Sequence, residues 1–308
     1  MDGTYDVIII GAGPAGLTAG LYTSRSKLST LIIEKETLGG ELVNRDLIEN
    51  YPGYPDGILG PELSGNMLNQ AMNYGTEFQL GEVEQIKIDG NRKVVQTSSG
   101  EYSGKAIIIA GGAHNKKLAV PGEQEFADKG VFYCATCDGP HFADKVVAVA
   151  GGGDSGITEG IFLTRLVSKV IIIEMLPQCT ATKILQDRAF SNPKIEVKCG
   201  SKIEAIIGDE QVKALDLLNI QTGERGTLEV DGILVHIGIE PNTDYLSGTV
   251  PLDSKGYVLV NEKMETEIPG VFAAGDIRLN SAWQIATAVG DGATAALSLV
   301  KYLGSLPG

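Results

Sequence analysis

Residues 6–16 read DVIIIGAGPAG, a short apolar run followed directly by glycines at the spacing G-x-G-x-x-G. The β-branched run predicts a buried strand, and the residues after it, to about Tyr22, predict a helix. The first glycine of such a turn permits the bend, the second lets the backbone approach a pyrophosphate, and the third lets helix and strand pack closely. A second apolar run, at 31–33, ends in Glu34, where a carboxylate can accept hydrogen bonds from the hydroxyls of an adenosine ribose. The stretch therefore predicts a dinucleotide-binding unit.

The same pattern occurs a second time. Residues 146–156 read VVAVAGGGDSG, and a later apolar run ends in Glu174. In both copies the third glycine precedes the acid by 18 residues, from 16 to 34 and from 156 to 174. Two such units imply two dinucleotide sites, as an enzyme that passes electrons from a nicotinamide to a flavin needs. In the second copy we expect the dinucleotide to contact Gly151, Gly153, Gly156 and Glu174.

The repeat also predicts the fold class and the domain boundaries. We expect an α/β protein with two Rossmann-like dinucleotide-binding domains, the second inserted into a discontinuous first domain. Polar segments with proline and glycine indicate crossovers near residues 115 and 242. The first domain would then comprise residues 1–115 and 243–308, and the inserted domain residues 116–242.

The last segment completes the first domain. A buried strand ends there in Gly275-Asp276, and a helix is expected to begin near Gln284. We expect one broad apolar face on this helix, formed by Ala288, Val289, Ala293, Ala296, Leu297 and Val300.

Residues 134–139 read CATCDG, which places two cysteines at the C-x-x-C spacing with an acid beside them. Such cysteines can close a disulfide ring, and a neighbouring acid can move the proton that each thiolate exchange requires. His141 completes the pattern of a zinc half-site, but a structural zinc needs four ligands and no fourth follows nearby. A structural disulfide is the other alternative. We predict redox catalysis by Cys134, Cys137 and Asp138, and no metal.

Composition and charge exclude several other classes of function. The net charge of −14 offers no basic footprint for nucleic acid or for an anionic membrane surface. The start of the chain lacks the basic region of a signal peptide, so we expect a cytoplasmic protein. The remaining histidines, His114 and His236, and the single cysteines Cys179 and Cys199 have no sequence neighbours that would activate them.

Together these motifs resemble the low-molecular-weight thioredoxin reductase family of FAD-containing flavoproteins. The matching pieces span nearly the whole chain: GAGPAG at 11–16, GG at 39–40, ENYPG at 49–53, CATCDG at 134–139, GGGDSG at 151–156, PGVFAAGD at 269–276 and QIATA at 284–288. The resemblance implies a homodimer with one FAD per chain and a redox disulfide. It further implies that the discontinuous domain is the FAD domain, and that the inserted domain, which carries the disulfide, is the nicotinamide domain. It also implies that the two domains swing, so that either the disulfide or the nicotinamide meets the flavin.

Site residues follow from the resemblance. It implies that the adenine half of FAD is held by Gly11, Gly13, Ala15, Gly16 and Glu34, and the flavin half by Gly40, Glu41, Asn50, Gly275, Asp276, Gln284 and Ile285. Glu41 departs from the family, which usually has glutamine there. Cys137 is implied as the thiol nearest the flavin, Cys134 as the thiol that exchanges with the partner disulfide, and Asp138 as the acid and base.

The segment after Glu174 bears on the electron donor. NADPH-using members of the family carry a basic cluster there, of the form His-Arg-Arg followed four residues later by Arg. Here residues 174–182 read EMLPQCTAT, and the first cation is Lys183. The flavoprotein component of alkyl hydroperoxide reductase, a relative that uses NADH, also places a glutamate at this strand end. We therefore expect NADH, and not NADPH, as the donor.

The predicted activity is electron transfer through FAD and the Cys134–Cys137 disulfide to thioredoxin or a similar small carrier. Two alternatives are consistent with the residues. One is a thioredoxin reductase that takes electrons from ferredoxin or a deazaflavin, and the other is a flavin-bound redox sensor without turnover.

Overall fold

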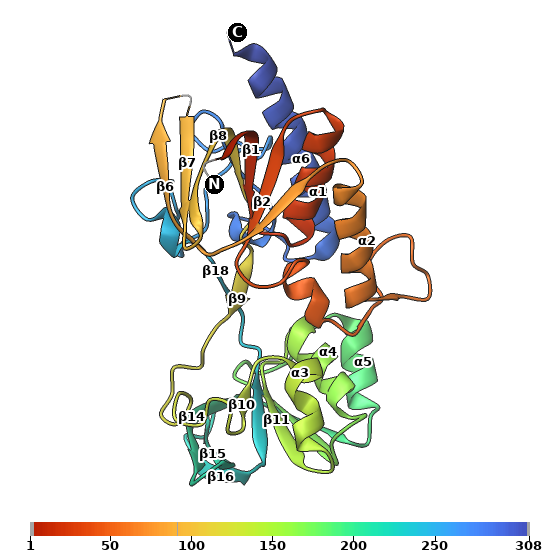
Figure 1. Ribbon diagram of the computed structural model, residues 1–308. Helices are drawn as coiled ribbons and strands as arrows, with labels where there is room; N and C mark the ends of the chain where they lie inside the picture. The colour runs from red at the N-terminus through yellow and green to blue at the C-terminus, as the bar shows by residue number, and fades with distance from the viewer. Residues whose placement is uncertain (1–2, 91, 307–308) are drawn as a thin grey trace. The chain divides into compact units, whose positions relative to one another are not determined.

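The computed structural model describes residues 3–90 and 92–306, and the chain divides into two compact units (Figure 1). The first unit is Met1–His114 with Glu240–Gly308, and the second is Asn115–Ile239. The boundaries expected from the sequence fall after residues 115 and 242, beside the observed ones after 114 and 239. The chain leaves the first unit through β9 (Ala113–Asn115) and returns through β18 (Ile239–Pro241).

The first unit is built on a mixed sheet with the strand order β5-β2-β1-β8-β7-β6, and β19 pairs with β8. The strands are β1 (Gly3–Ile10), β2 (Thr30–Glu34), β5 (Glu77–Leu80), β6 (Val83–Asp89), β7 (Arg92–Thr97), β8 (Gly100–Ile109) and β19 (Val271–Ala273). The helices are α1 (Pro14–Arg25), α2 (Gly60–Met72) and α6 (Ile285–Ser305). Short elements complete it: η1 (Gly40–Asn44), β3 (Leu47–Ile48), β4 (Ile58–Leu59), η3 (Asp244–Leu246) and η4 (Gly275–Ile277).

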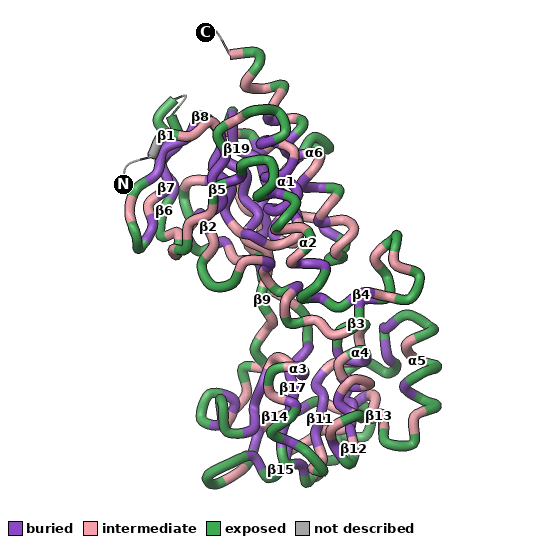
Figure 2. Tube along the Cα trace, turned by 45° about the vertical axis from the view of Figure 1, so that its right-hand side comes forward, coloured by how far each residue is buried: buried purple, intermediate pink, exposed green. Residues whose placement is uncertain are grey.

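The position of β1 inside the sheet explains why its apolar residues do not alternate with polar ones. Successive side chains of a strand point to opposite faces of the sheet. Val7 and Ile9 pack into the core under α1 and α6, whereas Ile8 and Ile10 pack into the core on the other face. Both faces of β1 are therefore covered over residues 7–10, which are buried, whereas residues 4–6 at the start of the strand are not (Figure 2). Such two-sided burial is typical of parallel sheets.

The glycine turn between β1 and α1 is required by the packing. Gly11 has a φ of +102°, a backbone conformation that side chains with a Cβ rarely adopt. A Cβ at Gly16 would lie 1.9 Å from the carbonyl oxygen of Gly11, so only glycine lets α1 start this close to the strand. The first turn of α1 therefore lies directly at the carboxyl end of β1, and no side chain of the described residues caps its backbone N–H groups.

The second unit repeats the winding of the first. Its parallel sheet has the order β10-β17-β11-β12-β13, and the segment β13-β12-β11-β17 corresponds to β5-β2-β1-β8. Its elements are β10 (Val131–Phe132), α3 (Ala135–Asp138), η2 (Gly139–Phe142), β11 (Val146–Ala150), α4 (Asp154–Leu163), β12 (Lys169–Glu174), α5 (Lys183–Phe190), β13 (Ile195–Cys199), β14 (Ser201–Gly208), β15 (Val212–Asn219), β16 (Arg225–Glu229) and β17 (Gly232–Val235). The shared strand order is that of Rossmann-like folds, which confirms the predicted fold class.

The prediction of one broad apolar face on the last helix is wrong in part. Helix α6 follows Gln284 as expected, but Leu297 is 48% exposed, and the buried positions include Asp291 and Gly292. A Cβ at Gly292 would lie 2.2 Å from the carbonyl oxygen of Ala15 on α1, so the helix contact selects for a small residue and not for a large apolar one.

No helix among the described residues is both long and apolar enough to cross a membrane.

Candidate active site

A groove of about 830 Å³ lies at the glycine turn of the first unit, a size within the range of small-molecule sites. It brings together most of the residues predicted to bind the first dinucleotide. Those that line it are Gly11, Gly13, Ala15, Glu34, Gly40, Glu41, Gly275 and Asp276. The predicted residues outside its lining are Gly16, Asn50, Gln284 and Ile285.

The residues outside the lining have structural partners. Gly16 permits the close packing of α1 on the strand. The Asn50 amide donates a hydrogen bond to the Gln284 side-chain oxygen at 3.0 Å, which joins the loop after β3 to the start of α6. Ile285 packs against the small core that contains Leu42. These residues therefore hold in place the elements around the groove.

Glu34 ends β2, where the sequence pattern predicts a ribose-binding acid. Its carboxylate accepts hydrogen bonds from the backbone N–H groups of Ala12 (2.7 Å) and Glu36 (3.0 Å). Each carboxylate oxygen can accept more than one hydrogen bond, so these two bonds fix the side chain without filling its capacity to accept. The carboxylate thus lies fixed beside the glycine turn.

Asp276 and Gly275 also line the groove. Burial raises the pKa of the Asp276 carboxyl, and Ser281, which donates a hydrogen bond at 3.2 Å, partly offsets this effect. Asp291 of α6 accepts two hydrogen bonds from Arg278, at 2.6 and 2.9 Å, and one from the Gly275 N–H at 3.1 Å. This part-buried ion pair joins the end of η4 to α6.

The groove also contains a tyrosine that sequence reasoning missed. Tyr245 of η3 lines the groove, and its buried hydroxyl has no hydrogen-bond partner among the residues that the structure describes. Its oxygen lies 3.1 Å from where a Cβ would stand on Gly111, so a side chain at that position would require the tyrosine to shift by a few tenths of an ångström. No motif signals this residue, because it follows a crossover and not a strand of the repeat.

The second glycine turn has the same construction as the first. Glu174, at the end of β12, accepts the Gly152 N–H at 2.6 Å and the Leu176 N–H at 2.8 Å. The two residues after this acid are apolar and exposed, Met175 at 54% and Leu176 at 45%. Lys183 begins α5. The strand end therefore presents an acid and apolar side chains where a phosphate-binding site would need cations.

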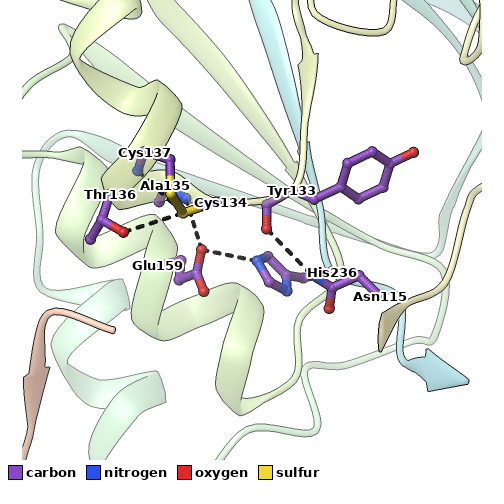
Figure 3. The surroundings of a disulfide bond; sticks show 8 residues. All are labelled: Asn115, Tyr133, Cys134, Ala135, Thr136, Cys137, Glu159 and His236. Carbon is purple, nitrogen blue, oxygen red and sulfur yellow. Dashed lines mark hydrogen bonds and ion pairs between the residues drawn. A yellow bond between two sulfur atoms is a disulfide. The ribbon is translucent and has the colours of Figure 1, made fainter. Parts of the chain in front are cut away.

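Cys134 and Cys137 form a disulfide at the start of α3 (Figure 3). The single helical turn between them places both sulfurs on one side, with the Cα atoms 5.4 Å apart. The Cys137 N–H donates to Cys134 Sγ at 3.2 Å, and the Thr136 hydroxyl lies 3.3 Å from the same sulfur. Cys137 is exposed and Cys134 is half-buried. Burial raises the pKa of the neighbouring Asp138 carboxyl, and His141 partly offsets this effect.

Glu159 and His236 lie beside the disulfide, and the sequence analysis assigned no role to either. Glu159 of α4 accepts the Ala135 N–H at 3.0 Å, and His236 Nε2 lies 3.0 Å from the same carboxylate oxygen (Figure 3). The His236 side chain, which follows β17, is only 2% exposed. Within the described part of the chain, no group of three or more His, Cys, Asp or Glu side chains is arranged to hold a metal ion.

Comparisons with known proteins agree with this geometry. The family profile of pyridine nucleotide-disulphide oxidoreductases matches residues 5–292. Over 304 residues the chain is 45% identical to the thioredoxin reductase of Listeria innocua (98% of this chain, 95% of the relative) and 45% identical to that of Bacillus subtilis (98% and 96%). The crystal structure of Lactococcus lactis thioredoxin reductase matches with a TM-score of 0.96 and 41% identity, over 98% of this chain and 100% of that one. The chain therefore belongs to the pyridine nucleotide-disulphide oxidoreductase family, and within it to the thioredoxin reductases.

Proposed function

We propose that the protein takes electrons from NADH and passes them through FAD and the Cys134–Cys137 disulfide to thioredoxin or a similar small carrier. One observation carries this proposal. The disulfide lies at the start of α3, and Cys137 is exposed. The same unit contains the second glycine turn, where the Gly152 N–H donates a hydrogen bond to Glu174 at the end of β12. A redox-active pair of cysteines in a dinucleotide-binding domain is the arrangement that disulfide reduction requires.

The groove of the first unit fits FAD. Its glycine turn lies at the N-terminus of α1, whose backbone N–H groups and dipole favour a pyrophosphate, and Glu34 is placed to accept from a ribose. The buried Tyr245 hydroxyl, which has no hydrogen-bond partner in the described part of the chain, also needs a partner there. We assign the adenine half to Gly11, Gly13, Ala15 and Glu34, and the flavin half to Gly40, Glu41, Gly275 and Asp276. When bound, FAD supplies the centre that passes two electrons from the nicotinamide to the disulfide.

The reduced dithiol would act by two thiolate exchanges. The Cys134 thiolate attacks one sulfur of the carrier disulfide, forms a mixed disulfide and releases the first carrier thiolate. Cys137 then attacks Cys134, which restores the enzyme disulfide and releases the second carrier thiolate. Asp138 is the proposed acid that gives a proton to a leaving thiolate. The Cys137 N–H that points at Cys134 Sγ favours the thiolate form of that residue.

Glu174 supports NADH over NADPH. Its carboxylate can accept hydrogen bonds from the 2′- and 3′-hydroxyls of NADH, whereas a 2′-phosphate would meet like charge. The exposed side chains that follow, Met175 and Leu176, provide no cation for that phosphate. The lost charge pairs and the repulsion together should cost about 2–4 kcal/mol, or roughly 30-fold to 1000-fold in discrimination.

Flavin reduction without oxygen tests the donor. NADH should bleach the flavin absorbance of the purified protein, and NADPH should do so only at much higher concentration. Equal reduction by NADPH would contradict the argument from Glu174. If neither nicotinamide reduced the flavin but reduced ferredoxin or a deazaflavin did, the second enzyme hypothesis would replace this one. Reduction without turnover of any carrier would favour the sensor.

We also propose a homodimer, which light scattering in solution tests.

A further inference from the structure

Two thiols outside the C-x-x-C motif lie against each other in the second unit. Cys179 follows β12, and Cys199 ends β13, the neighbouring parallel strand, where it lies opposite Glu174. Their sulfur atoms are 3.9 Å apart, and neither is in a disulfide. Cys179 is buried and Cys199 is half-buried. The pair brings together two cysteines that are isolated in the sequence.

The segment that carries Cys179 is attached to the second glycine turn. A Cβ at Gly152 would lie 2.8 Å from Cys179 Sγ, so the sulfur rests directly on the turn. The backbone N–H groups of Thr180 and Ala181 donate to the Gly152 carbonyl oxygen, at 3.0 and 3.1 Å. On the other side, the Gly200 N–H donates to the carbonyl oxygen of Leu176 at 2.8 Å. Residues 175–182 therefore connect the turn to the end of β13.

The two thiols differ in their exposure to solvent. Burial, aided by Cys199 and Glu174, raises the pKa of the Cys179 thiol to about 12, so this group stays protonated at neutral pH. Cys199 is the more exposed residue of the pair, so we take it as the one that an oxidant in solvent meets first. Reaction at Cys199 would then place an oxidised sulfur within contact of a buried thiol, the arrangement of a redox-sensing cysteine beside its resolving cysteine.

We propose that Cys179 and Cys199 form a second redox pair, which a hydroperoxide converts to a disulfide, and that this disulfide weakens dinucleotide binding at the second glycine turn. The effect on binding rests on the proposed function. The Cys199 thiolate attacks the O–O bond, which yields a sulfenic acid and, from hydrogen peroxide, hydroxide. Cys179 then attacks the sulfenic sulfur, the S–S bond forms, and water leaves with the Cys179 proton. Two electrons pass from the thiols to the peroxide, and an added dithiol reverses the change.

The expected effect on the turn follows from distance. A disulfide needs its sulfurs about 2.05 Å apart, so bond formation must draw the two side chains together from 3.9 Å. Movement of Cys179 toward Cys199 takes its sulfur off Gly152 and strains the hydrogen bonds that Thr180 and Ala181 make to that residue. The turn that would face the pyrophosphate then loses its support.

The test uses the full-length protein with Cys134→Ser and Cys137→Ser, so that only Cys179 and Cys199 can titrate. Stoichiometric hydrogen peroxide should remove both thiols, counted in denaturant, and lower the mass of the joined peptides by two hydrogen atoms. Dithiothreitol should restore both. The Kd for NADH should rise by about 5-fold or more, the lower end of usual coupling between two sites. Hydrogen exchange of residues 175–182 should also change on oxidation.

A Cys199→Ser variant in the same background is the matched control, since it keeps Cys179 and cannot form the bond; peroxide should leave its Kd for NADH unchanged. Sulfenic or sulfinic acid without a disulfide would overturn the proposal, as would a disulfide that leaves the Kd unchanged. If the reduced protein binds neither NADH nor NADPH, the proposed donor fails. The thiol count and the exchange of residues 175–182 then decide the inference, and unchanged exchange on oxidation would overturn it.

Discussion

Glu159 illustrates how a single residue supports the redox turn. It accepts the N–H of Ala135, a fully buried residue between the two cysteines, and lies against the buried His236. Glu159→Ala would leave the Ala135 N–H without its acceptor, which should destabilise the second unit by about 1–3 kcal/mol. Denaturant unfolding measures this loss. Carrier reduction should also slow, because the turn that holds the cysteines is no longer fixed.

Glu159→Gln is the matched control, because the amide oxygen can still accept from Ala135. It should retain more than half of the stability lost in Glu159→Ala. Equal losses in the two variants would mean that the charge opposite His236, and not the bond to Ala135, supports the turn.

Asp138 gives a prediction about pH. Burial raises the pKa of its carboxyl, so the protonated acid persists to higher pH than for an ordinary aspartate. The acid form is lost as pH rises through that raised pKa, and the step that uses it should slow over the same range. Asp138→Asn should lower kcat for the carrier by about 100-fold or more and abolish this limb of the pH profile. A limb of the profile that persists in Asp138→Asn would assign the proton to another group.

At the scale of elements, the sequence was sufficient for the repeated strand, turn and helix. The G-x-G-x-x-G turns and the strand-end acids Glu34 and Glu174 are local patterns, so both Rossmann-like windings were predictable. The pair formed by Glu159 and His236 was not, because it joins α4 to the end of β17 and neither residue belongs to a motif. The exposed Leu297 was mispredicted because helix periodicity cannot reveal that a neighbouring helix demands glycine.

Helix α6 provides the test of that contact. Gly292→Ala would place a methyl group 2.2 Å from the Ala15 carbonyl oxygen, so α1 and α6 must move apart. We expect a loss of about 1–3 kcal/mol in stability and weaker FAD retention, because Ala15 lines the groove. Thermal unfolding and the ratio of flavin to protein measure both effects.

Gly290→Ala is the control on the same helix, since a Cβ there would meet nothing within 4 Å. It should be neutral or stabilise the protein by up to about 1 kcal/mol, because alanine favours a helix over glycine. A similar loss in both variants would attribute the effect to the helix backbone and not to the contact with α1.

At the scale of the whole molecule, the proposed cofactor groove and the redox disulfide belong to different units. The groove is lined by residues of the first unit, whereas Cys134 and Cys137 lie in the second. Cys134→Ser and Cys137→Ser should therefore each abolish carrier reduction yet leave FAD bound. Gel filtration followed by the absorbance ratio of flavin to protein measures retention. Loss of flavin in either variant would contradict the independence of the two units.

The same two variants distinguish the roles of the cysteines. If Cys137 is the thiol that meets the flavin, its free thiolate in Cys134→Ser should give a long-wavelength absorbance band. The free Cys134 thiolate in Cys137→Ser should give none, because it is the thiol that exchanges with the carrier. Absorbance spectra of the two purified variants across a range of pH make the comparison. The opposite pattern would exchange the two roles.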